Sequence, residues 1–140
     1  MEKRSKINFI PILSVTVCLA ILFTPLICGY FNEQEYNNKL KSNAELVVGV
    51  VTGYNKGYKR AYMVEYEFSY HDKVYHSMSS GNQTEYSDLI KRGILGRTFP
   101  VVVNKSEPEK FSIILITPND FQQIGYLFPD SLNWVKHIVE

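Results

Sequence analysis

The chain has 140 residues, of which 21% are charged and 45% hydrophobic, and its formal net charge is +1. This balance excludes a disordered chain, a collagen-like repeat and a disulfide-dense mini-protein. A net charge this close to zero gives no global field that would recruit nucleic acid, so we expect no nucleic-acid partner.

The most pronounced signal is an uncharged, mainly apolar segment over residues 7–32. About 20 helical residues, at roughly 1.5 Å of rise each, cross the hydrocarbon core of a bilayer. Three cations stand in residues 1–6, and an excess of Lys and Arg beside a span marks its cytoplasmic end. We therefore expect a single-pass protein of the cytoplasmic (inner) membrane, with the lipid bilayer as one partner, residues 1–6 in the cytoplasm and residues 33–140 exported.

A cleaved secretory signal or a lipoprotein signal is the alternative to this anchor. The apolar run is longer than the roughly 7–15 residues of a signal peptide, and no Ala-x-Ala-like exit follows it. The residues before the two cysteines, Val17 and Ile27, are large rather than small, which disfavours a lipoprotein. Both cysteines, Cys18 and Cys28, lie inside the predicted span, so the exported part has no disulfide, Cys-ligated metal or Cys nucleophile.

The predicted span is followed by a polar segment and then by enough sequence for one domain. Residues 33–43 are rich in Asn, Glu and Lys and predict a tether that is helical if it continues the span. Residues 44–140 are sufficient for one modest hydrophobic core, and we expect them to form a β-rich extracytoplasmic domain.

Short β-branched and aromatic runs predict five strands in this domain. The clearest alternates Tyr62, Val64 and Tyr66 on one face with Met63 and Glu65 on the other, as a half-buried strand does. The spacing of the first three strands predicts an antiparallel meander with a tight turn at 71–73. The expected strands are 46–51, 62–70, 74–79, 98–103 and 111–116.

The sequence also predicts where the fourth and fifth strands lie in the sheet, at an edge or in the centre. Pro100 predicts that the fourth strand lies at an edge or that the proline is at a strand start, since proline cannot donate to a ladder. The fifth run is almost continuously apolar, which predicts a central strand.

Three helices are expected around the sheet. One begins at Thr84 as N-cap and stops at Gly93; a second begins at Thr117 as cap, with Pro118 at its first position; a third covers 131–139. The fold class is therefore mainly β (α+β): a five-stranded curled antiparallel sheet or small open barrel with peripheral helices.

Few residues suggest chemistry. His71, His76 and His137 show no metal-binding spacing, and solvated histidines are the simpler interpretation. Glu65 and Glu67 share a strand face, but one opposite the aromatic stripe, where solvent is expected. No nucleophile elbow, phosphate loop or dinucleotide fingerprint is present, so we expect no catalytic residue, no metal and no cofactor.

The ten tyrosines are the unusual feature of the composition. Those of the second strand are expected in the core, with their hydroxyls at its rim. A turn that is both aromatic and basic follows the first strand and is the candidate interaction surface, suited to an acidic partner or anionic lipid headgroups: Tyr54, Lys56, Tyr58, Lys59 and Arg60. Trp134 in the last helix fits core packing better than an interfacial helix on the membrane, and the second alternative stays open.

The middle of the chain resembles a bacterial family of small membrane-anchored proteins with a β-rich domain of unknown function. The resemblance covers residues 46–116 and implies that fold and no catalytic residues. It rests on Val50-x-x-Gly53, Tyr66-x-Phe68-x-Tyr70-x-Asp72-x-x-Tyr75, Gly96-x-x-Phe99-Pro100-Val101-x-Val103 and Glu107-Pro108-Glu109.

These observations predict a single-pass, non-enzymatic envelope protein whose domain binds another envelope protein. The alternative is an immunity or accessory protein that acts on a membrane partner through the span itself, where Pro25, Cys28 and Gly29 offer a helix-packing face.

Overall fold

The computed structural model describes residues 31–56, 62–81 and 83–139. The predicted span over 7–32 lies almost entirely outside these residues, as do the candidate surface residues Tyr58, Lys59 and Arg60. No helix within the described part of the chain has both the length and the hydropathy to cross a bilayer. The chain divides into two compact units, Met1–Tyr36 and Asn37–Glu140.

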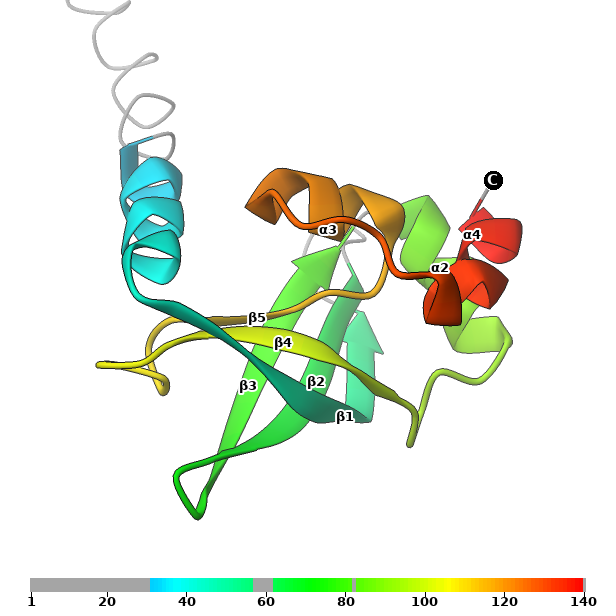
Figure 1. Cartoon of the computed structure of the whole chain (residues 1–140). Helices are drawn as coiled ribbons and strands as arrows, with labels where there is room; N and C mark the ends of the chain where they lie inside the picture. The colour runs from blue at the N-terminus through cyan, green and yellow to red at the C-terminus, as the bar shows by residue number, and fades with distance from the viewer. Residues whose placement is uncertain (1–30, 57–61, 82, 140) are drawn as a thin grey trace, which may run out of the picture. The chain divides into compact units, whose positions relative to one another are not determined.

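The second unit is built on a five-stranded antiparallel sheet with the strand order β3-β2-β1-β4-β5. The sheet curls strongly, and helices α2, α3 and α4 lie on one side of it (Figure 1). This confirms the predicted curled sheet with peripheral helices and the meander of the first three strands. The strands are β1 (Ala44–Lys56), β2 (Tyr62–Tyr70), β3 (Lys73–Gly81), β4 (Thr98–Asn104) and β5 (Ser112–Ile114).

Strand β1 is shared between the two halves of the sheet. Its first part, Ala44 to Val50, pairs with β4, and its second part, Gly49 to Lys56, pairs with β2. The register with β2 shifts between Val51 and Gly53, which is the signature of a β-bulge and increases local bending and twist. The bulge therefore lies where β1 leaves one partner for the other.

The alternation predicted for β2 is confirmed. Val64, Tyr66 and Phe68 are at most 2% exposed and face the core, whereas Glu65 and Glu67 stand on the other face and are partly exposed. The Tyr66 hydroxyl is buried, 3.2 Å from Ser112 Oγ, rather than at the rim. Tyr66 thus joins β2 to β5 through the interior.

The β2–β3 hairpin closes through a two-residue turn. His71 and Asp72 have φ of +48° and +59°, and Tyr70 pairs directly with Lys73. Two central residues with positive φ define the type I′ turn, whose twist suits a two-residue hairpin. The turn expected at this position is therefore confirmed.

Strand β5 is not central, contrary to the prediction. It has three residues, pairs only with β4 and is last in the strand order. Its last residue Ile114 and the following Leu115 and Ile116 are nonetheless 0% exposed, because the curl folds this edge back over the interior. The apolar run correctly indicates that these residues are buried, but in a curled sheet a buried strand need not be central.

Strand β4 is not at an edge either, although it contains Pro100. It pairs with β1 on one side and with β5 on the other. The Pro100 carbonyl accepts from Leu115 N, beyond the last β4–β5 pair, Val101 with Ile114. Since the N–H and C=O of a strand residue point to the same side, the missing N–H would also face Leu115, so the proline costs one bond at the end of the β4–β5 ladder and none toward β1.

Helices α2 (Gln83–Lys91), α3 (Pro118–Ile124) and α4 (Asn133–Val139) cover the core side, and a 3-10 turn, η2 (Asp130–Leu132), precedes α4. The predicted start of α3 is confirmed: Thr117 caps it in a capping box, with Pro118 in the first turn. The predicted stop of α2 at Gly93 is consistent with its left-handed φ of +80°. The N-cap at Thr84 was wrong, because α2 already includes this residue in its first turn.

Residues 31–42 are helical, and the second part of this helix belongs to the sheet-containing unit. Leu40 is 0% exposed, the Lys39 carbonyl accepts from Asn104 Nδ2 at 2.6 Å, and Lys41 Nζ donates to the Gln123 carbonyl. The segment expected as a tether over 33–43 therefore contributes a buried side chain to the domain.

Candidate functional site

Two residues of the candidate surface, Tyr54 and Lys56, are described, and both lie near the end of β1. Tyr54 is 48% exposed and pairs with Val64, while Lys56 pairs with Tyr62. Because they are two positions apart, their side chains share one face of the strand. The structure thus places an aromatic and a basic side chain together, and the other three residues remain a prediction.

A second exposed surface lies on the side of β1–β3 away from the helices, which we term the open face. Apolar side chains that would normally be covered are exposed there. Val48 is 68% exposed, Val74 50% and Met78 57%, and Leu46 and Val50 on β1 are also exposed. The registers, Val50 with Glu67 on β2 and Glu65 with Met78 on β3, place these residues of β1 and β3 on one face, with β2 between them. Clustered apolar exposure of this kind marks an interaction surface more often than single exposed residues do.

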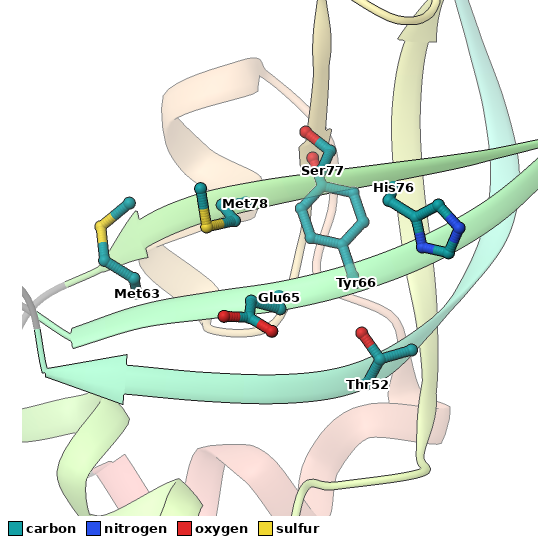
Figure 2. Close-up of a pocket in the computed structure, with 7 residues that line it drawn as sticks. All are labelled: Thr52, Met63, Glu65, Tyr66, His76, Ser77 and Met78. Carbon is teal, nitrogen blue, oxygen red and sulfur yellow. The ribbon is translucent and has the colours of Figure 1, made fainter.

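The open face contains a shallow hollow of about 560 Å³. Figure 2 shows Met63 and Met78 toward one end of it and His76 toward the other, with Glu65 between them. The hollow is lined by Thr52, Met63, Glu65, Tyr66, His76, Ser77 and Met78.

The two glutamates considered from the sequence are each engaged on this face. Glu65 Oε1 accepts from Asn55 Nδ2 at 3.0 Å, and Glu67 Oε2 lies 3.4 Å from His76 Nδ1 across the β2–β3 pair. Both contacts are exposed, so they orient the carboxylates and stabilise the fold only slightly. The arrangement provides two negative groups inside an apolar surface.

The three histidines lie on separate elements. His71 is in the hairpin turn with its ring 4.2 Å from that of Tyr70, His76 is on β3, and His137 is in α4. Within the described part of the chain, no group of three or more His, Cys, Asp or Glu side chains is arranged to hold a metal ion.

Trp134 packs on the domain, as favoured from the sequence. Its ring lies 6.1 Å from that of Phe99 on β4, and the Arg97 guanidinium lies 4.3 Å above it. Val135 and Leu132, beside it, are buried. The sequence did not reveal the pairing with Arg97, because 37 positions separate the two residues and no local pattern links them.

Tyr86 on α2 is a buried titratable side chain. Its hydroxyl donates to Asp120 Oδ2 at 3.0 Å, and its side chain is 1% exposed. Burial, followed by the negative charge and hydrogen bond of Asp120, raises the pKa of Tyr86 well above 10. The ring also occupies the space that a side chain at Gly81 would need.

We expect the stability of the domain to fall above pH 10 through Tyr86. The unfolded phenol ionises near pH 10. The folded one has a raised pKa and keeps its proton to higher pH, so the stabilisation is complete below pH 10 and is lost as the pH rises. Tyr86→Phe removes this contribution. We compare the free energies of unfolding of the wild type and of Tyr86→Phe. The wild type's value minus the variant's should decrease by up to about 1.4 kcal/mol for each pH unit above pH 10. Urea titrations at pH 8 and pH 11 measure it, and a constant difference would contradict the role of the buried hydroxyl.

No family model, no curated protein and no solved structure matches this chain. The resemblance to membrane-anchored proteins with a β-rich domain therefore stays a prediction.

Proposed function

We propose that the chain is a single-pass envelope protein of the cytoplasmic membrane, whose exported domain binds another protein and catalyses no reaction. The observation that carries the binding function is the open face of β1–β3. There Val48 on β1 and Val74 and Met78 on β3 expose half or more of their surface, on the two strands that flank β2. Burying such side chains against a partner is the main favourable contribution to protein association.

The charges on this face indicate the chemistry of the partner. Glu65 and Glu67 lie among the exposed apolar side chains, and His76 contacts only one of them in the described structure. A complementary surface would therefore present apolar side chains around a Lys or Arg. The membrane anchor, the orientation and the membership of the resembled family belong to this proposal and rest on the sequence.

The test places a photoreactive residue at Met78 in the full chain in intact cells. We expect it to crosslink one defined protein, and Val48→Asp to lower that yield at least tenfold, because a charge in the apolar face opposes burial. Leu127→Asp is the matched control: Leu127 is apolar and 94% exposed but lies outside the open face, so the yield should not change. Equal loss in both variants, or no crosslink at Met78, would contradict the proposal.

The alternative, action through the membrane span, is separated by exchanging residues 7–32 for an unrelated span. Retained crosslinking at Met78 supports the exported domain as the binding element. Lost crosslinking, with the exchanged protein still inserted and folded, supports the immunity or accessory function.

A further inference from the structure

Two hollows share Arg97 and Trp134. They lie at the end of the domain where α2 and α4 are side by side (Figure 1). The first, of about 420 Å³, is lined by Arg92, Arg97, Trp134, His137 and Ile138. The second, of about 400 Å³, is lined by Gly96, Arg97, Thr98, Ser131, Leu132 and Trp134. The side chains around them offer nitrogen and hydroxyl donors, and no carboxylate lines either hollow among the described residues.

Arg97 is held in a defined orientation. Its guanidinium carbon lies 4.3 Å from the centroid of the Trp134 ring, and its Nε donates to the Gly93 carbonyl at 3.0 Å. Stacking on an indole fixes the plane of a guanidinium, and the Nε bond fixes its rotation. The described part of the chain provides no hydrogen bond or ion pair for its two terminal nitrogens. These donors are therefore oriented and available.

The loop that carries Arg92 and Arg97 is itself fixed to the sheet. Gly96 N donates to the Val51 carbonyl at 2.8 Å, and Val51 N donates to the Arg97 carbonyl at 3.0 Å. Ile94, between the two arginines, is 0% exposed and anchors the loop in the core. A site whose donors are already in place loses less entropy when it binds a ligand.

We propose that these residues form a binding site for a phosphate group. Arg97 and Arg92 present planar guanidinium donors to the first hollow, and a guanidinium fits two phosphate oxygens at once. His137 lines the same hollow, and Thr98 and Ser131 line the second, which shares Arg97 with the first. A multiply charged oxyanion satisfies several such donors together, which a chloride ion cannot do. Free phosphate and the phosphodiester of a lipid headgroup share this chemistry.

The only tryptophan of the chain, Trp134, makes the site directly observable. The full chain in a non-ionic detergent is titrated with inorganic phosphate at constant ionic strength, and Trp134 fluorescence is followed. We expect a saturable change that sodium chloride does not produce. Arg92→Gln should raise the dissociation constant at least tenfold, and it leaves the stacked Arg97 in place. Lys105→Gln is the matched control: it also removes one cation, but from the β4–β5 loop beside Glu45, and binding should not change.

A second readout is needed for Arg97→Gln, because this change alters the surroundings of Trp134 directly. Calorimetric titration of the variant, folded by circular dichroism, should show no phosphate binding. If this variant fails to fold, Arg92→Gln and His137→Gln carry the test, each with the same expected loss of affinity.

Two further ligands distinguish the source of the phosphate. Short-chain phosphatidylglycerol that binds tighter than inorganic phosphate, with phosphatidylcholine much weaker, assigns an anionic lipid headgroup; Leu95 in the same loop, 56% exposed, could then contact acyl carbons. Inorganic phosphate binding tighter than both lipids assigns a free phosphate. An equal response to chloride, no response to any of these ligands, or wild-type affinity in both arginine variants would overturn the site.

Discussion

Tyr66→Asp is expected to abolish folding of the domain. The Tyr66 side chain is 1% exposed and its hydroxyl lies 3.2 Å from Ser112 Oγ, so a carboxylate there would be buried without a cation. Burying an unpaired charge and losing an aromatic core residue together cost several kcal/mol. A domain of about a hundred residues has only about 5–15 kcal/mol in total. Urea denaturation of the full chain in detergent, followed by Trp134 fluorescence, should show no cooperative transition.

Two further variants make this result interpretable. Glu67→Lys changes the residue directly after Tyr66, which lies on the open face, and should alter the free energy of unfolding by only about 0.5 kcal/mol. Tyr66→Phe keeps the ring and should cost about 1 kcal/mol for the lost hydrogen bond. Equal tolerance of Tyr66→Asp and Glu67→Lys would mean that the two faces of β2 are assigned the wrong way round.

Asp120→Ala is expected to lower the free energy of unfolding by about 3 kcal/mol. One oxygen, Asp120 Oδ2, accepts from Thr117 N at 2.8 Å, from Ile116 N at 3.1 Å and from the Tyr86 hydroxyl at 3.0 Å. Ile116, Thr117 and Tyr86 are at most 1% exposed, so removing the carboxylate leaves buried donors without an acceptor. The same urea titration measures the change.

The control for Asp120→Ala removes a carboxylate from the surface of the neighbouring helix. Asp88 pairs with Lys91 at 3.0 Å on the exposed side of α2, and Asp88→Ala should change stability by less than about 0.5 kcal/mol. Asp120→Asn, which keeps an acceptor at the cap, should lie between the two alanine variants. If Asp120→Ala were as mild as Asp88→Ala, the helix cap would not contribute through these hydrogen bonds.

The sequence predicted best where one short-range rule acts alone. The alternation from Val64 to Tyr70 specified both a strand and its buried face, since side chains alternate across a strand whatever surrounds it. Thr117, Pro118 and Asp120 specified the start of α3, because a capping box depends only on residues within one turn.

It failed where the outcome depends on the shape of the whole sheet. The apolar run around Ile114 indicated a central strand, yet curling buries this edge as completely as a centre. Pro100 indicated an edge or a strand start, yet β4 is paired on both sides and Pro100 lies within it, next to its last pair with β5. Both errors arose because the path of one strand was inferred without the positions of its neighbours.

The two surfaces that we propose as binding sites were the least predictable. The open face includes residues of β1 and β3, which no single periodic segment contains. The site around Trp134 requires the loop at Arg97 and the last helix to meet, and this contact is set by tertiary packing. Tyr54 and Lys56 were identified because they are close in sequence.

The long shared strand β1 has a consequence for how the chain reaches its fold. Its β4 pairing joins Ala44 to Asn104, so closing this half brings together residues about sixty positions apart, whereas the β2 half closes locally. Because β1 belongs to both halves, a fragment that contains only one half leaves one side of β1 unpaired. We therefore expect one all-or-none unfolding transition and no independently stable fragment. Topologies dominated by such distant pairings fold in roughly milliseconds to seconds, and the newly made polypeptide cannot complete this sheet before Ile114 has been synthesised.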